Sequence, residues 1–140
     1  ELTAINQYWL HYRTLHHWGV RKLAEKEREE SIDEMKHADK LADRVLFLDG
    51  LPNVQRLDKL SIGQTVPEQF KADLELEYRA VKRLNDGIQL CRERGDVGSE
   101  ELLRKILVGE EDHVDWLETQ LRLIAELGDK SYLVEQLRGS

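Results

Sequence analysis

Apolar residues recur at every third or fourth position along four long segments of the chain, which is the spacing of amphipathic helices. The first segment covers residues 1–18 and stops at Gly19. Its inward face is expected to contain Glu1, Ile5, Tyr8, Tyr12 and Leu15. The second segment covers residues 20–48 and ends where Gly50 would cap the helix and Pro52 would prevent its continuation. The pattern is already running at residue 1, which indicates that the sequence lacks the start of the first helix.

The third segment opens with a capping box formed by Thr65 and Glu68 and ends near Gly95. Ser99 is the expected cap of the fourth helix, which ends at Gly128, and a short fifth helix follows over residues 129–137. The 17 residues from 49 to 65 have no helical period. Fully extended, they reach about 56 Å, which exceeds the length of about 42 Å expected for a helix of about 28 residues. This loop can therefore span a bundle and make the second and third helices parallel.

The predicted fold is all-α: a single domain over residues 1–140, built as a four-helix bundle with one long crossover loop and a short fifth C-terminal helix. Charged residues make up 35% of the chain, and Gly and Pro together number only 11 of 140, which favours long helices. No apolar run is long enough for a membrane span. The single cysteine, Cys91, excludes a disulfide framework within one chain. A net charge of -7 with scattered basic residues argues against nucleic-acid binding.

Acidic residues interrupt the inward stripe of every long helix. The stripe residues that carry ionisable groups are Glu1 on the first helix, Glu27, Glu30, Glu34 and His37 on the second, Glu77 on the third, and Glu110 and His113 on the fourth. The second stripe continues through Leu41, Val45 and Leu48. A buried carboxylate is costly unless it is paired or bound to a cation, so these acids require a shared explanation.

Their spacing supplies one, because the pattern Glu-x32-Glu-x2-His occurs twice, 76 residues apart. The first copy is Glu1, Glu34 and His37, and the second is Glu77, Glu110 and His113. Positions i and i+3 share a helix face, so each Glu–His pair can address one metal ion. Two helix pairs packed together would form a site of four carboxylates and two imidazoles, which suits iron or manganese better than structural zinc. A structural bundle with buried ion pairs remains the alternative.

This layout resembles the ferritin-like di-iron motif. The stretches ELTAINQYWLHYR, ESIDEMKHADKLADRVLFLDGLPNVQ and EEDHVDWLETQLRLI are similar to bacterioferritins, and the resemblance covers essentially the whole chain. It implies that the six residues are ligands of two iron ions per subunit, with Glu34 and Glu110 in bridging positions. It also implies that Tyr8 lines the site, that Trp116 lies near it, and that Leu41 replaces a frequent tyrosine.

The activity implied by the resemblance is a ferroxidase, which oxidises Fe(II) with dioxygen or peroxide and stores the product as a mineral. The implied assembly is a cytoplasmic homo-oligomer of 24 subunits built from dimers, with a ferredoxin-type redox partner for iron release. A ferritin-like di-metal peroxidase or oxygenase that stores nothing is the alternative enzyme.

The resemblance further implies that Met35 is an axial ligand of a haem b shared between two subunits. The other residues expected to line the haem pocket are Leu2, Asn6, Trp9 and Ile32. On a helix, Met35 lies about 100° from Glu34 and hence away from the iron site.

The remaining candidate residues are expected either at a cavity or at the surface of the protein. Glu30 and Asp33 either face an inner cavity of the assembly or form a solvated acidic turn. His11, His16 and His17 are expected at the surface, and Cys91 is expected to pack as a small apolar residue.

Overall fold

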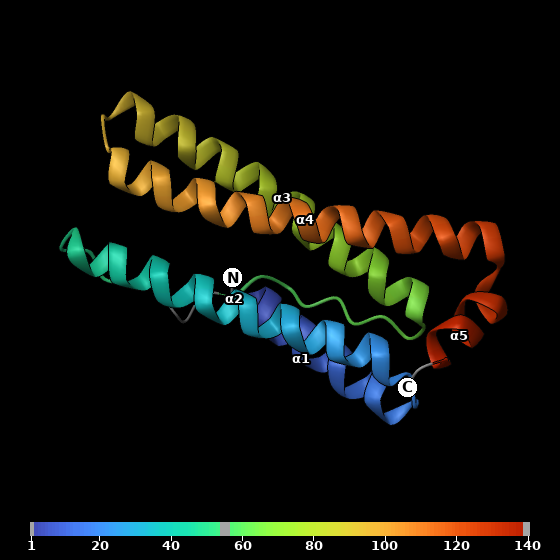
Figure 1. The fold of residues 1–140 in the computed structure, drawn as a ribbon. Coiled ribbons are helices and arrows are strands. Elements are labelled where there is room, and N and C mark those ends of the chain that lie inside the picture. Colours follow the sequence, from blue (N-terminus) through green and yellow to red (C-terminus); the bar gives the residue numbers. More distant parts are fainter. Residues whose placement is uncertain (1, 54–56, 139–140) are drawn as a thin grey trace.

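The computed structural model describes residues 2–53 and 57–138. Its helices are α1 (Leu2–His17), α2 (Arg21–Phe47), α3 (Val66–Glu93), α4 (Val97–Leu127) and α5 (Asp129–Leu137). Over these residues the predicted all-α bundle with a short fifth helix is confirmed (Figure 1). Among the same residues, no helix combines the length and apolar character that crossing a membrane requires.

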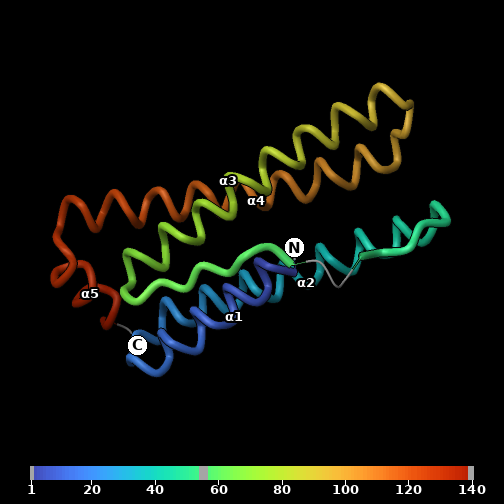
Figure 2. The backbone as a smooth tube through the Cα atoms, turned by 180° about the vertical axis from the view of Figure 1, so that it is seen from behind, coloured from blue at the N-terminus to red at the C-terminus, as the bar shows by residue number. Residues whose placement is uncertain are grey.

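The four long helices are arranged as two hairpins. Helix α1 packs along α2, and α3 packs along α4. Helices α2 and α3 run in the same direction, as the crossover length predicted (Figure 1). Seen from behind, the segment that leads into α3 lies along α1 between the two hairpins (Figure 2).

The crossover is fixed to α1 by backbone hydrogen bonds at successive turns of the helix. The N–H of Asp58 donates to Oγ1 of Thr3 over 2.9 Å, and the N–H of Ser61 donates to Oε1 of Gln7 over 3.2 Å. A third bond joins the N–H of Gly63 to Nε2 of His11 over 3.1 Å. Polar residues at positions 3, 7 and 11 therefore satisfy the backbone of an extended segment that has no ladder partner.

The capping box at the start of α3 is confirmed, because Thr65 accepts from the N–H of Glu68 while the Glu68 carboxylate accepts from the N–H of Thr65. The predicted cap at Ser99 is wrong. Asp96 caps α4 instead: its Oδ1 accepts from the N–H of Ser99 over 3.1 Å and from Nη2 of Arg44 over 3.0 Å. Ser99 lies inside the first turn of α4, and its hydroxyl accepts from Nε of Arg44 over 3.0 Å.

The end of α2 also differs from expectation. Asp49, and not Gly50, takes the left-handed conformation, with φ of 64°. The N–H of Gly50 then donates to the carbonyl of Val45 over 2.8 Å. Aspartate is one of the few residues with a side chain that tolerates this conformation.

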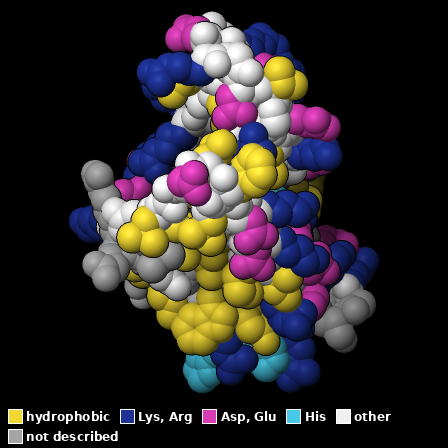
Figure 3. Space-filling view, turned by 90° about the vertical axis from the view of Figure 1, so that its left-hand side faces the viewer, with side chains coloured by type: hydrophobic (Ala, Val, Ile, Leu, Met, Phe, Trp, Pro, Cys, Tyr) yellow, Lys and Arg dark blue, Asp and Glu magenta, His cyan; other side chains and the backbone are white. Residues whose placement is uncertain are grey.

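The main apolar core lies toward α5 and holds that end of the bundle together. Its buried members are Leu15, Val20, Leu23, Ala24, Val66, Phe70, Leu117, Ile124 and Tyr132. The opposite end of α2 is exposed, so the prediction that Val45 and Leu48 face inward is wrong: 37% and 53% of their surfaces are accessible. Figure 3 shows hydrophobic side chains gathered on the lower, α1–α2 half of the molecule, among charged groups.

Candidate metal centre

Three glutamates from three helices reach the interior near the middle of the bundle. Glu34 of α2, Glu77 of α3 and Glu110 of α4 are 2%, 1% and 1% exposed. His113 is also buried, and His37 is partly exposed. The structure therefore brings together five of the six residues predicted from the repeated pattern. The sixth, Glu1, lies outside the described residues.

The imidazoles face carboxylates across the helix interfaces. Nδ1 of His37 lies 3.0 Å from Oε1 of Glu110 and 3.6 Å from Oε2 of Glu34. Nδ1 of His113 lies 3.1 Å from Oε1 of Glu77. The phenol of Tyr8 donates a hydrogen bond to that same oxygen of Glu77, which confirms that Tyr8 lines the cluster.

The pKa values of the two facing carboxyl groups in the cluster, Glu77 and Glu110, are shifted in opposite directions. Burial and the adjacent carboxyl group of Glu110 raise the pKa of Glu77 to about 11. Burial also acts to raise the pKa of Glu110, but hydrogen bonds with His37 and Glu77 and the charge of His37 outweigh it, so this pKa lies below its usual value. Burial lowers the pKa of His113. Without a cation, one carboxyl group therefore keeps a proton and the other is ionised.

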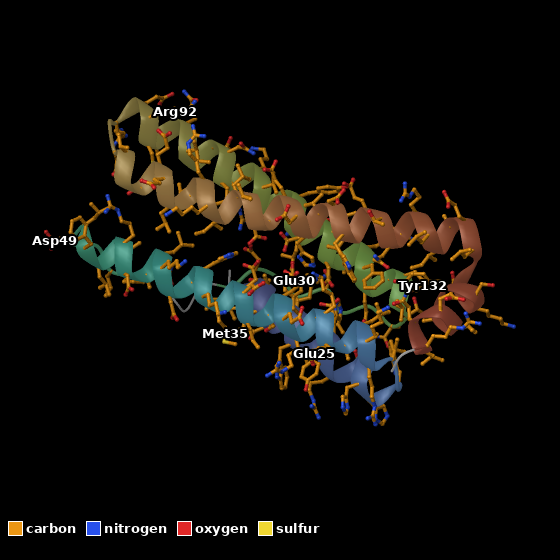
Figure 4. All side chains as sticks on the ribbon, viewed as in Figure 1. Glu25, Glu30, Met35, Asp49, Arg92 and Tyr132 are labelled. Carbon is orange, nitrogen blue, oxygen red and sulfur yellow. The ribbon has the colours of Figure 1, made fainter. Side chains whose placement is uncertain are left out.

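A cavity of about 240 Å³ opens on this cluster and is lined by Glu34, His37, Glu110, His113 and neighbouring polar residues of α2 and α4. Lys26 lies at the cavity, with Nζ 2.9 Å from Oε1 of Glu30 and 5.1 Å from the centre of the Trp116 ring. Oε2 of Glu30 lies 3.4 Å from Nδ1 of His113, so a single acid links the lysine to the buried cluster. Figure 4 shows Glu30 on the side of α2 that faces α4.

Other predicted residues fall into place around the centre. Trp116 is half-buried, with its ring 6.4 Å from that of His113. Leu41 is half-buried, and exposed Asp33 lines the same cavity as Glu30. His16 and His17 are exposed as expected, and Cys91 is half-buried.

Met35 and its predicted neighbours lie on the outer face of the α1–α2 hairpin. Met35 is 45% exposed and Trp9 is 54% exposed, which is high for large apolar side chains. Asn6 is exposed, while Leu2 and Ile32 are half-buried. Figure 4 shows Met35 on the opposite side of α2 from Glu30. The thioether thus points away from the carboxylate cluster, as the helical spacing indicated.

The surface position predicted for His11 is wrong, because this side chain is fully buried. Its Nδ1 lies 3.0 Å from Oδ1 of Asp73 and 3.9 Å from Oε1 of Glu27. The predicted inward face of α1 included Tyr12, which is only half-buried. The buried residue at this turn is His11, one position earlier. Thr3, Gln7 and His11 recur every four residues, but their polar character concealed this face from an apolar pattern.

The donor set of the central cluster fits iron. Oε2 of Glu77 is buried and has no hydrogen-bonding partner among the described residues, and Glu34, His37 and Glu110 each present a donor atom within 4.8 Å of the others. Carboxylate oxygens with one imidazole for each ion suit iron or manganese, and these ions would offset the buried negative charge.

The bundle and this buried set of carboxylates and imidazoles define a protein of the ferritin-like class, and the ferritin-like domain model matches residues 1–127. The chain is 54% identical over 132 residues to bacterioferritin of Mycobacterium leprae (strain TN), covering 94% of this chain and 83% of that protein. Bacterioferritin BfrA of Mycobacterium tuberculosis (strain ATCC 25618 / H37Rv) matches with the same identity and coverage. Bacterioferritin of Streptomyces coelicolor (strain ATCC BAA-471 / A3(2) / M145) is 53% identical over 133 residues, covering 95% of this chain and 80% of that protein. The chain belongs to the bacterioferritin family.

The raised pKa of Glu77 predicts a pH-dependent stability in the metal-free protein. The bound proton stabilises the fold fully below the unfolded pKa of roughly 4.3, and this contribution is lost as the pH rises toward the folded value of about 11. Glu77→Gln should therefore reduce the loss of unfolding free energy with rising pH, by up to about 1.4 kcal/mol per pH unit. Denaturant unfolding in EDTA between pH 5 and 9 measures the slope. Exposed Glu75→Gln is the control, and equal slopes for the two variants would contradict the prediction.

Proposed function

We propose that this chain is an iron-storage subunit that oxidises Fe(II) to Fe(III) at a di-iron centre within the bundle. The proposed ligands are Glu1, Glu34, His37, Glu77, Glu110 and His113. The observation that supports this most directly is the convergence of three buried carboxylates and two imidazoles near the middle of the bundle, where Glu34, His37, Glu110 and His113 line one cavity. Membership of the bacterioferritin family supports iron storage, and we extend this to a shell of 24 subunits assembled from dimers in the cytoplasm.

The protein groups divide the work of binding and charge control. Glu34 and Glu110 would bridge two ions, and His37 and His113 would each bind one. Glu77 must release its proton before it can bind a cation, and Tyr8 donates a hydrogen bond to its carboxyl group. Two Fe(II) ions held there as substrate would each give up one electron, and these two electrons with two protons would reduce dioxygen to hydrogen peroxide or hydrogen peroxide to two waters. Anionic oxygen donors favour Fe(III) over Fe(II), so oxidation is promoted by the ligand set itself.

A haem b site is proposed on the outer face of the α1–α2 hairpin. Met35 would bind one side of the haem iron, and the same residue of a second subunit would bind the other. A thioether is a soft axial ligand that raises the haem potential. Leu2, Asn6, Trp9 and Ile32 would line the pocket. The exposure of Met35 and Trp9 supports a surface that another molecule covers. A ferredoxin-type partner would deliver electrons through this haem to release stored iron.

Glu110→Ala should slow Fe(II) oxidation by more than about tenfold, because it removes a ligand and not only a group that orients one. Stopped-flow absorbance after adding two Fe(II) per chain measures the rate, and gel filtration of the aerated sample measures the iron retained by a large particle. Glu111→Ala removes an exposed carboxylate from the next position and is the matched control. A normal rate in Glu110→Ala would refute the centre. Oxidation without retained iron would favour a di-metal oxygenase.

Met35→Leu should abolish haem binding and leave Fe(II) oxidation within about twofold, because Met35 and the carboxylate cluster lie on opposite sides of α2. The haem absorbance per subunit and the oxidation rate are measured on the same sample. Glu110→Ala should show the reverse pattern. Loss of both properties in Met35→Leu would show that the two faces are not independent.

Lys26→Gln should accelerate cation uptake at low ionic strength. The ammonium of Lys26 lies at the cavity and occupies an oxygen of Glu30, so it repels an incoming divalent ion. A divalent ion and one unit charge about 4 Å apart in water repel by about 2 kcal/mol, which corresponds to roughly thirtyfold in rate as an upper bound. Stopped-flow Co²⁺ binding with rising salt measures the effect, which screening should diminish. Exposed Lys22→Gln makes the same charge change one helical turn away, and an equal response in both variants would refute a role for Lys26.

A further inference from the structure

A second buried cluster of ionisable side chains lies outside the proposed di-iron centre. It consists of Gln7 and His11 from α1, Glu27 from α2 and Asp73 from α3, all at most 2% exposed. His11, Glu27 and Asp73 each offer a ligand-type atom within 4.8 Å of the others. By composition alone this set could hold a cation as well as the central one does.

The backbone of the crossover determines which atoms of this cluster donate hydrogen bonds and which accept them. Backbone N–H groups can only donate, so Gly63 makes Nε2 of His11 an acceptor and places the ring proton on Nδ1. In the same way the N–H of Ser61 donates to the amide oxygen of Gln7, so the NH₂ group of Gln7 points inward. Both donors then converge on Oδ1 of Asp73, at 3.0 Å from His11 and 2.9 Å from Gln7. Two such bonds to one oxygen favour the ionised form of the Asp73 carboxyl group.

Three oxygens remain without a donor. Both carboxyl oxygens of Glu27 and Oδ2 of Asp73 are buried with no hydrogen-bonding partner among the described residues. Two ionised carboxylates this close would repel strongly in a dry interior, so either a cation or a proton must lie between them. A metal ion bound by His11, Glu27 and Asp73 together would need the lone pair of His11 Nδ1, but that nitrogen carries the proton. The N–H of Gly63 can only donate, so it keeps Nε2 as the acceptor and leaves the ring proton on Nδ1.

We propose that Glu27 and Asp73 share one proton, so that this cluster is a proton-binding site and excludes the metal ions that the neighbouring centre takes up. The cluster then carries a single negative charge, on Asp73. The statement that the neighbouring centre takes up metal ions rests on the proposed function. The proton shared by Glu27 and Asp73 does not depend on that function.

The surrounding charges agree with this assignment. Burial raises the pKa of Glu27 far above its usual value. The charge of Asp73, the hydrogen bond that a protonated Glu27 would donate to Asp73 and the charge of Glu30 raise it further, while Lys26 acts in the opposite direction. Burial also acts to raise the pKa of Asp73, but its hydrogen bonds with Glu27, His11 and Gln7 outweigh it, so this pKa lies below its usual value.

Groups on every packed helix take part in this balance. Helix α1 presents His11 and Tyr8, α2 presents Lys26 and Glu30, and α4 presents His113, whose own pKa responds to Asp73 and Glu30. The proton on Glu27 stabilises the fold at low pH, and this contribution is lost as the pH rises through the raised pKa. The charge on Asp73 contributes above its unfolded pKa and is lost as the pH falls through the lowered one.

The test uses the full chain loaded with Co²⁺, where metal binding has displaced the proton of Glu77. Infrared difference spectra between the unchanged protein and Glu27→Gln should show one carboxylic-acid carbonyl band that the variant lacks. The Co²⁺ content per chain, measured by elemental analysis after gel filtration, should be equal in both. Glu25→Gln, an exposed acid on the same helix, should alter neither quantity.

The proposal would be overturned if Glu27→Gln lost one Co²⁺ per chain, because the cluster would then be a cation site. It would also be overturned if the carbonyl band were unchanged. Failure of the di-iron proposal has a different signature, namely Co²⁺ content that is unaffected by Glu110→Ala. The Glu27→Gln variant should fold, because its amide can donate to Oδ2 of Asp73 as the shared proton does.

Discussion

Carboxyl groups held away from water set the conditions for the rest of this structure. Glu77 and Glu110 lie against each other inside the bundle, each about 1% exposed, where two negative charges cannot both be tolerated without compensation. The pKa values respond by moving in opposite directions, so that Glu77 holds a proton and Glu110 is ionised beside His37. Such a pair is poised to exchange its proton for a cation, because the ion satisfies both oxygens at once. The apolar core toward α5 holds the helices in register around this point.

The long crossover contributes more than a connection between parallel helices. Its backbone N–H groups bond to Thr3, Gln7 and His11, so α1 carries a polar stripe that supports an extended segment. In each of these bonds the backbone N–H is the donor, so the side-chain atom that receives it must be an acceptor. For Gln7 and His11 this leaves the other polar atom of the side chain as the donor. A loop without secondary structure thereby fixes which ring nitrogen of a buried histidine accepts a hydrogen bond and which one donates.

The sequence allowed much of this to be predicted, for identifiable physical reasons. Helix limits follow from local signals such as the Thr65–Glu68 capping box, and the central cluster follows from a spacing that repeats with the helices. The choice between Asp96 and Ser99 as a cap does not, because both residue types suit that role and Arg44 on another helix donates to both. His11 was missed because its partners, the Gly63 amide and the Asp73 carboxylate, belong to no apolar pattern. The exposure of Val45 shows a further limit: an apolar stripe marks a face to be covered, without saying by which chain.

The two buried clusters of this bundle contain similar side chains and differ in how their donors are arranged. In the central cluster Nδ1 of each imidazole faces carboxylate oxygens. In the cluster of His11, Glu27 and Asp73, the crossover has already committed the ring proton. Residue identity and proximity alone would rank both as candidate metal sites. In the proposal above, the polarity of a single amide hydrogen bond separates them, so that the preference of each cluster for a cation or a proton depends on backbone direction as much as on side-chain chemistry.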